Sequence, residues 1–264
     1  ANTWLSIASS GALSTEIFLA APSMTRMRSS SALPTTTSAS NPQNFDATVP
    51  LHPKVETAIA KAQQWLVAKQ NKNGSWEQNN GVNAMAAIAL MVNGHTPGKG
   101  EHGTAVAKAI DFIISGQEKN GFLALGRKGP MYQHALATLA LSEAYGMNQN
   151  PKIREALIKA VELIVYCQHS EGGWRYHPKP MKGDLSATVM QVMALRASAE
   201  AGIYVPQETI DHAVRFIKGC WQEKQQGFSY MRGGGKKNFN RLGAGVVCLQ
   251  SVGLHKTPMI PAAI

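Results

Sequence analysis

The sequence predicts an all-α protein of four helical hairpins, and three observations carry that prediction. A similar stretch of about 50 residues occurs four times after residue 51. The first helix of each copy spaces its apolar residues at i, i+3, i+4 and i+7, which is typical of an amphipathic helix. The second helix is apolar nearly all round, so we expect it to be buried on all sides. This alternation predicts outer helices arranged around inner ones.

Residues 1–50 differ in composition from the rest and are predicted to form a tail. The segment Ser29–Ser40 is rich in Ser, Thr, Ala and Pro, and it cannot bury enough apolar surface to order itself. The segment Trp4–Pro22 is too short and too polar for a transmembrane helix, and it ends in small residues like a signal-peptide cleavage region. Two interpretations stay open: a targeting or anchoring remnant of an exported or membrane-associated protein, or a plain disordered tail. The sequence leaves the compartment unknown.

The repeat domain is predicted to span residues 51–264, with copies at about 58–95, 105–146, 156–202 and 209–253. In the first copy, Ile59, Ala62, Trp65 and Leu66 lie on one helical face, and residues 84–91 form the apolar second helix. Gly and Pro punctuate the connections, as expected at helix ends. Small residues dominate the second helices, which allows close packing where the inner helices converge.

A glutamine, several polar residues, a glycine and an aromatic residue separate the two helices of each copy. The glutamines are Gln70, Gln117, Gln168 and Gln222, and the aromatic residues are Trp76, Phe122, Trp174 and Phe228. We expect the glutamine amide to bond free N–H groups of a neighbouring helix, with the aromatic ring packed beside it. The motif is therefore predicted to be structural.

This pattern resembles the QW motif of squalene-hopene cyclases and its counterparts in protein prenyltransferase β subunits. The stretches MYQHALATLALSEAYG and GGWRYHPKPMKGDLSATVMQVMAL are also similar to bacterial squalene-cyclase-like proteins. The resemblance covers roughly Val55–Leu254 and implies an α/α toroid, an α/α barrel that is incomplete here. It also implies a fuller ring than four hairpins, so a fragment, closure by a second subunit or by self-association, and an open solenoid all stay open.

Two chemistries that the resemblance implies depart from their patterns in this sequence. Squalene-hopene cyclases use the middle acid of a DxDD motif, whereas Asp184-Leu185-Ser186-Ala187 keeps the first Asp and has Ser186 in the place of the acid. Prenyltransferases bind zinc through an Asp-x-Cys pair, and Ser186 lacks the thiolate. No metal and no other cofactor is expected. Whether the protein is an enzyme stays open, and Asp184 also fits an ordinary helix N-cap.

The resemblance places the site at the end of the ring where the inner helices begin. The candidate catalytic residues are Asp184, His134 and Tyr132, although His134 also fits a hydrogen-bonded core histidine and Tyr132 a packing residue. A basic rim there would bind an anion, or its charges would simply be solvated. The candidate anion-binding residues are Arg127, Lys128, Arg175, Tyr176, Lys182, Lys236, Lys237 and Arg241.

The net charge of +10 favours anionic partners. The leading hypothesis is a terpenoid cyclase or prenyltransferase-like protein that binds an isoprenoid or lipid-like anion in a central cavity, with a membrane surface as a further partner. The alternative is a non-catalytic repeat scaffold for proteins, with the central space filled by Met85, Met131, Met190 and Met193. No helix-turn-helix, zinc-finger or RNP pattern is present, so nucleic acid is not an expected partner. The three cysteines are expected to be small buried hydrophobes.

Overall fold

The computed structural model describes residues 52–126, 128–234 and 239–263. The predicted tail, residues 1–50, lies outside the described residues. Eight helices form four hairpins, which confirms the all-α prediction. These helices are α2 (Pro53–Lys69), α3 (Asn80–Met91), α4 (Gly103–Ser115), α5 (Pro130–Asn148), α6 (Pro151–Tyr166), α7 (Leu185–Glu200), α8 (Gln207–Gly219) and α9 (Phe239–Ser251).

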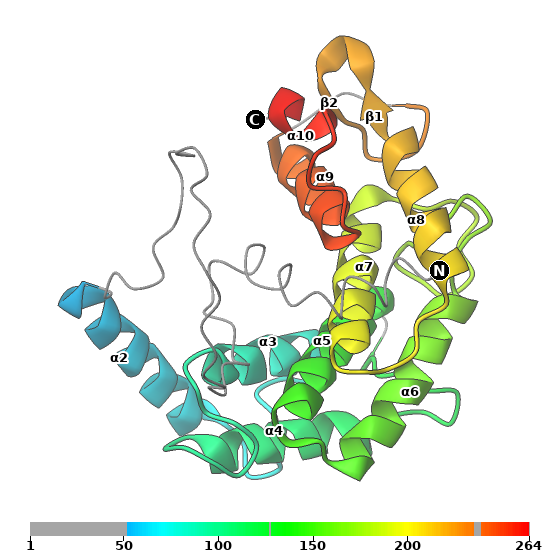
Figure 1. Ribbon diagram of the computed structural model, residues 1–264. Coiled ribbons are helices and arrows are strands. Elements are labelled where there is room, and N and C mark those ends of the chain that lie inside the picture. Colours follow the sequence, from blue (N-terminus) through cyan, green and yellow to red (C-terminus); the bar gives the residue numbers. More distant parts are fainter. Residues whose placement is uncertain (1–51, 127, 235–238, 264) are drawn as a thin grey trace, which may run out of the picture.

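The hairpins follow one another around an arc with two layers (Figure 1). Helices α3, α5, α7 and α9 form the inner layer, in which each helix packs mainly against the next one along the arc. Helices α2, α4, α6 and α8 form the outer layer. After α8 the chain forms a small antiparallel hairpin, and after α9 it forms one more short helix. These elements are β1 (Trp221–Gln222), the 3-10 turn Glu223–Gln225, β2 (Gly227–Phe228) and α10 (Met259–Ala263).

Local sequence sets the helix boundaries. Asn79 and Asn150 are the N-caps of α3 and α6, and their side chains accept hydrogen bonds from backbone N–H groups of the first turn. Pro130 and Pro151 occupy the first helical position of α5 and α6, where the missing N–H costs nothing. These residues therefore fix where α3, α5 and α6 begin.

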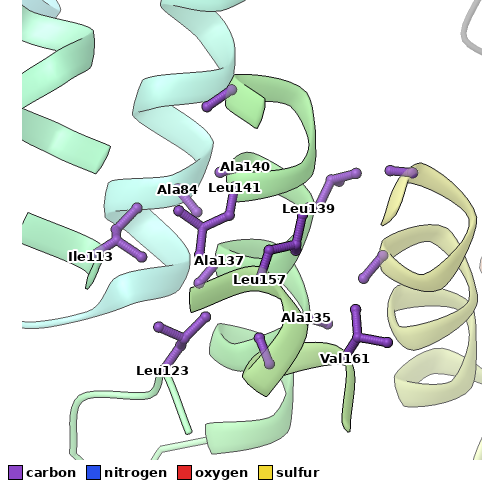
Figure 2. Packing of buried hydrophobic residues seen from close by; sticks show 14 of the residues in the cluster. Ala84, Ile113, Leu123, Ala135, Ala137, Leu139, Ala140, Leu141, Leu157 and Val161 are labelled. Carbon is purple, nitrogen blue, oxygen red and sulfur yellow. The ribbon is translucent and has the colours of Figure 1, made fainter. Parts of the chain in front are cut away.

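The core lies between and behind the inner helices. Figure 2 shows Ala84 of α3 beside Ala137 and Leu141 of α5, and all three are fully buried. Alanines at these crossings let the helix backbones approach closely, while Leu157 and Val161 of α6 fill the space behind α5 and α7. Each fully buried Leu or Val side chain contributes roughly 1.5–3 kcal/mol. Cys167, Cys220 and Cys248 are buried and unpaired, as expected.

The expectation that the inner helices are buried on all sides is wrong. Each of α3, α5 and α7 keeps one stripe of partly or fully accessible residues along its length, on a side that no described helix covers. Inner neighbours bury both flanks of α5 and α7, whereas α3 has a described inner neighbour, α5, on one flank alone. The outer helices lie behind these three helices, and no described element covers the front. We call these three stripes together the concave face. Its residues are Val82, Met85 and Ala89 on α3, Tyr132, Leu136, Glu143 and Met147 on α5, and Ser186, Met190, Met193 and Glu200 on α7.

The glutamine of the repeated motif joins consecutive outer helices, but by donating rather than accepting hydrogen bonds. The Gln168 amide nitrogen donates to Thr209 O at 2.9 Å in the first turn of α8 and to Gly172 O at 2.9 Å in its own loop. Gln70 bonds Ala105 and Gly74 in the same way, and Gln117 bonds Ala156 and Gly121. The expected acceptance from free N–H groups is therefore wrong. The structural role of these three glutamines is confirmed.

The glycine of the motif is required by a close approach of two backbones. Gly172 has φ +94°, and a Cβ at this position would lie 2.0 Å from His212 O of α8. Gly74 and Gly121 have nearly the same φ, and their Cβ atoms would clash with the carbonyl groups of Lys108 and Lys159. Only glycine adopts this conformation without strain and leaves room for the next helix.

The fourth copy of the motif departs from the register of the other three. In the third repeat Gln168 lies four residues after the buried Ile164. In the fourth repeat Trp221 lies four residues after the equivalent Ile217, so Gln222 comes one residue later than the other glutamines. The Gln222 amide nitrogen reaches only Trp221 O at 3.3 Å and Ser229 Oγ at 3.5 Å. We call the hydrogen bonds from the motif glutamine to the next outer helix and to its own loop a staple. The loop after α8 forms the β1–β2 hairpin instead of a staple. The fourth glutamine was thus wrongly grouped with the others.

Candidate functional site

Three tyrosines gather at the end of the arc where the inner helices begin. Tyr132 lies in the first turn of α5, Tyr176 in the loop before α7, and Tyr230 in the loop after β2. The rings of Tyr132 and Tyr176 stack with centroids 5.7 Å apart, and the hydroxyl groups of Tyr176 and Tyr230 are hydrogen-bonded. Burial raises the pKa of Tyr132 to about 12 and raises the pKa of Tyr230 as well. Tyr132 and Tyr230 therefore act as neutral hydrogen-bonding groups near neutral pH. We call Tyr132, Tyr176 and Tyr230 together the tyrosine cluster.

A chain of hydrogen bonds connects the tyrosine cluster to a buried carboxylate. The Tyr132 hydroxyl donates to Ser186 Oγ at 2.8 Å, and the Ser186 hydroxyl donates to Asp184 Oδ1 at 2.8 Å. Tyr132 and Ser186 lie on the concave face, while Asp184 is fully buried behind them. Ser186, which stands where the cyclase acid was expected, thus links Asp184 to the accessible surface.

Asp184 is the N-cap of α7, as its position before an apolar helix indicated. Its Oδ1 accepts from the Ala187 N–H at 2.8 Å. Its Oδ2 has no hydrogen-bond partner within the described part of the chain and lies 3.8 Å from Arg175 Nε. The capping role of Asp184 is confirmed. Its second carboxylate oxygen, Oδ2, takes no part in capping.

Backbone hydrogen bonds hold the loops of this end together. The Met131 N–H donates to Tyr176 O at 3.0 Å, and the Leu185 N–H donates to Tyr230 O at 2.9 Å. These bonds join the starts of α5 and α7 to the loops of the next repeats. The loops that precede the inner helices therefore lie at one end of the arc, where the N-terminal dipoles of these helices also converge.

The predicted basic residues occupy this end unequally. Lys128 and Lys182 are exposed in the loops before α5 and α7, and Arg175 is partly exposed beside Asp184. Arg241 is partly buried in the first turn of α9. Tyr176 belongs to the tyrosine cluster rather than to the charged rim. Arg127, Lys236 and Lys237 lie outside the described residues.

His134 is separated from this cluster and is fully buried. Its Nδ1 accepts from the Leu123 N–H at 3.3 Å, and its Nε2 lies 3.1 Å from Ala160 O, to which it donates. Asn83 and Thr188 accept equivalent backbone hydrogen bonds in the first and third repeats, from Trp76 and Trp174. Burial lowers the pKa of His134 to about 4. The neutral imidazole has no ring nitrogen left to offer to a ligand.

Sequence reasoning missed a pair of acids at the opposite end of the concave face. Glu143 on α5 and Glu200 on α7 lie on the accessible stripes, close enough for their charges to interact. Burial raises the pKa of Glu143, and the charge of Glu200 raises it further. The signal was available in the sequence: Glu143 is the only Asp, Glu, Lys or Arg in Pro130–Asn148, and it follows Tyr132 by eleven residues, close to three helical turns.

A second hollow lies on the outer side of the arc, away from the concave face. This half-open cleft of about 510 Å³ is formed by α6 and the connection from α7 to α8. Its walls include Tyr166 and Tyr204, both of which are largely exposed. The cleft shares no residue with the tyrosine cluster.

Neither a metal centre nor a membrane span is found in the part of the chain that the structure describes. No group of three or more His, Cys, Asp or Glu residues is placed there to hold a metal ion. No helix among residues 52–126, 128–234 and 239–263 is both long and apolar enough to cross a membrane.

Solved structures share this architecture. Type II terpene cyclase MstE from Scytonema, in complex with its substrate geranylgeranyl dihydroxybenzoate, matches with a TM-score of 0.52 and 16% identity. The match covers 82% of this chain and 62% of that one. The fold is that of the type II terpene cyclases. A protein from Actinoplanes matches with a TM-score of 0.52 and 15% identity, over 80% of this chain and 64% of that one.

One curated protein is similar in sequence. Drimenyl diphosphate synthase from Streptantibioticus cattleyicolor is 25% identical over 167 residues, which span 60% of this chain and 30% of that protein. No protein-family profile matches the chain. The chain thus spans under a third of this relative's length and under two thirds of the MstE chain. The predicted resemblance to terpenoid cyclase-like proteins is confirmed at the level of the fold.

Proposed function

We propose that the concave face binds an isoprenoid or lipid-like anion. The observation that carries this proposal is an apolar strip that leads away from the tyrosine cluster. Leu136, Met190 and Met193 continue the stripes that begin at Tyr132 and Ser186. A prenyl chain would lie along this strip and bury its methyl groups against the leucine and methionine side chains.

The anionic head of such a ligand would lie at the tyrosine cluster. The N-termini of α3, α5 and α7 place the positive ends of their dipoles there, and Arg175, Lys128 and Lys182 add full charges. Tyrosine hydroxyl groups donate hydrogen bonds to phosphate or carboxylate oxygens. The excess of positive charge over the whole chain favours the encounter with an anion.

The likeness to terpene cyclases supports the same class of ligand. The MstE substrate carries a geranylgeranyl chain, and drimenyl diphosphate synthase is named for an isoprenoid diphosphate. If the protein is an enzyme, Asp184 would act through Ser186 and Tyr132, because its own carboxylate is buried. Arg175 would neutralise the phosphate. On binding, its guanidinium group would pair with the phosphate instead of with Asp184.

Native mass spectrometry with geranylgeranyl diphosphate tests this proposal. We expect one diphosphate per chain, with retention weakened by Tyr132→Phe and by Arg175→Gln. Arg154→Gln, on the outer side of α6, is the matched control and should bind like the wild type. Asp184→Asn keeps a side-chain oxygen that can cap α7 but removes the negative charge. This variant therefore distinguishes the effect of the charge from the effect of the cap. A wild-type chain that retains no prenyl diphosphate would refute ligand binding at the concave face.

A second candidate function is docking of another toroid hairpin, for which α2 gives a specific reason. Its Trp65 is 61% exposed, whereas the equivalent Phe216 of α8 is fully buried. Ala58 and Ala62, which are exposed on the same side, correspond to the buried Ala105 and Ala109 of α4. In the later repeats a preceding inner helix and a Gln–Gly–aromatic loop cover this side, so a hairpin of the same kind fits α2.

Self-association through this side of α2 can be tested by light scattering during gel filtration. We expect Trp65→Lys to lower the oligomeric state of the full chain, and Tyr204→Lys, at an even more exposed aromatic residue, to leave it unchanged. An oligomeric state that is the same for the wild type and Trp65→Lys would count against α2 as the interface.

A further inference from the structure

The outer cleft, between α6 and the connection from α7 to α8, combines an apolar base with aromatic walls. Val161 and Ile203 are its buried lining residues, and Val165 is partly accessible beside them. Tyr166 and Tyr204 are 62% and 80% exposed. The volume of the cleft, about 510 Å³, falls within the range of about 300–1,000 Å³ that is typical of ligand pockets. An apolar hollow flanked by two exposed aromatic rings is a candidate binding site.

The large side chains that α6 contributes to this cleft are not a requirement of the repeat. Of the four outer helices, only α6 has large apolar or aromatic residues at the positions of Ile158 and Tyr166. The equivalent residues are Ala60 and Ala68 on α2, Ala107 and Ser115 on α4, and Asp211 and Gly219 on α8. The other hairpins fold with small or polar residues at these positions, so the aromatic cleft is a special feature of the third repeat.

The Tyr166 ring already contacts a lysine that lies between two prolines. The ammonium group of Lys179 lies 4.7 Å from the ring centroid, within the range of a cation–π interaction. Pro178 and Pro180 flank Lys179 in the loop before α7. Within the described residues no other ring and no cation packs on the Tyr204 ring. One wall of the cleft therefore accepts a basic, proline-rich stretch of the chain itself, and the other wall is available to a second chain.

The charges beside the cleft suit a ligand with one basic residue. Glu162 is exposed and lies one helical turn before Tyr166. In the part of the chain that the structure describes, no basic side chain pairs with Glu162, and Lys159 pairs with Glu155 at 2.8 Å. Arg154 precedes Glu162 by eight residues, which is about 12 Å along the helix. Because the two opposite charges lie apart, a peptide with one basic residue would bind in one direction.

We propose that the outer cleft binds a proline-rich segment of a partner protein, and that Glu162 pairs with a basic residue of this segment. Such a segment adopts the polyproline II conformation before it binds, so little conformational entropy is lost. Its proline rings pack against Tyr166 and Tyr204, and the tyrosine hydroxyl groups donate hydrogen bonds to its carbonyl oxygens, which have no internal partners. A prenyl diphosphate suits the cleft less well, because Glu162 repels its negative charges.

Fluorescence anisotropy of a labelled synthetic peptide tests this site in the full chain. The probe is a short peptide of prolines with one central lysine, and the control peptide has glycine and serine in place of the prolines. We expect binding of the probe and not of the control. Tyr204→Ala should weaken binding about 10-fold or more, whereas Tyr204→Phe should retain most of it because the ring remains. Tyr204 is largely exposed, so neither change threatens folding.

The ion pair is tested by changing the charge on both partners. Glu162→Gln should weaken binding of the lysine peptide about threefold. The same variant should bind a peptide with glutamine in place of the lysine as the wild type does. Asp111→Asn is the matched control, because Asp111 occupies the equivalent position on α4, outside the cleft. Equal effects of Glu162→Gln on the two peptides would refute the pairing with a basic residue.

Other outcomes would overturn the proposed partner. Equal binding of the proline peptide and the glycine–serine peptide, or unchanged binding by Tyr204→Ala, would remove the reason to expect a proline-rich segment. Geranylgeranyl diphosphate should leave the peptide bound, and its displacement of the peptide would assign the cleft to a lipid anion instead. The cleft is separate from the concave face, so a chain that binds the peptide but no diphosphate would refute only the ligand proposed for the concave face.

Discussion

The first three outer-helix junctions and the loop after α8 begin from nearly the same residues and end in different structures. At Gln70, Gln117 and Gln168 the glutamine donates to the next outer helix, and a glycine with φ above +90° lies against that helix. One extra residue after Ile217 shifts Gln222 out of this position, and the loop folds into the β1–β2 hairpin. The difference teaches that register, rather than composition, makes the motif a staple.

The largest effect is expected where the staple allows no side chain. Gly172→Ala should lower the free energy of unfolding by roughly 3–5 kcal/mol, because its Cβ would overlap His212 O. Gly202→Ala is the matched control: its φ is +87°, but a Cβ there meets nothing within 4 Å. The control should cost only about 1–2 kcal/mol. Urea denaturation followed by circular dichroism measures both, and equal losses would rule out backbone contact as the reason for the glycine.

The pH dependence of stability distinguishes the second repeat from the first and third. His134 occupies the bonding position that Asn83 and Thr188 occupy elsewhere, and only the histidine titrates. Its pKa is lowered to about 4, whereas the unfolded chain takes up the proton near pH 6.5. Stability should therefore fall as the pH drops from 6.5 towards 4, by on the order of 3 kcal/mol.

Chemical denaturation at several pH values checks this dependence. His134→Gln should flatten the profile between pH 6.5 and 4, while the control His177→Gln, in an exposed loop, should keep the slope of the wild type. An unchanged slope in His134→Gln would assign the acid sensitivity to other groups.

A smaller effect is expected from the glutamine itself. Gln168→Ala removes two hydrogen bonds and should cost about 2 kcal/mol, because it leaves Thr209 O and Gly172 O without this donor. Gln222→Ala should cost roughly 0.5 kcal/mol, since its two contacts are long. Thermal unfolding of the two variants makes the comparison, and similar losses would show that the fourth glutamine is also a staple.

Much of the fold was predictable because helical periodicity depends on local spacing. The four hairpins, the two layers and the capping role of Asp184 follow from apolar spacing and from residues next to each helix start. The direction of the glutamine bonds was not predictable, since the amide carries both a donor and an acceptor. The open front of the inner helices was missed because alanine and methionine are apolar whether or not a neighbouring element covers them.

The candidate site was predicted less well than the fold. The resemblance places the site at the end of the ring where the inner helices begin. It therefore singled out Tyr132, Tyr176 and Asp184, which lie near the starts of these helices. His134 stands beside Tyr132 in sequence, yet the helical rotation of about 100° per residue turns it into the core. Glu143 was overlooked for the opposite reason: it lies far from Tyr132 in sequence and returns to the same face after three turns.

The arc has a further consequence for how the protein unfolds. Each hairpin contacts chiefly its neighbours, so stability is distributed as in a one-dimensional array. Helix α5 lies between α3 and α7, and most of its residues are buried, whereas Gln63 is the one buried residue of α2. Opening should therefore begin at α2 and spread towards the middle. In native-state hydrogen exchange, the amides of α2 should exchange first and those of α5 last.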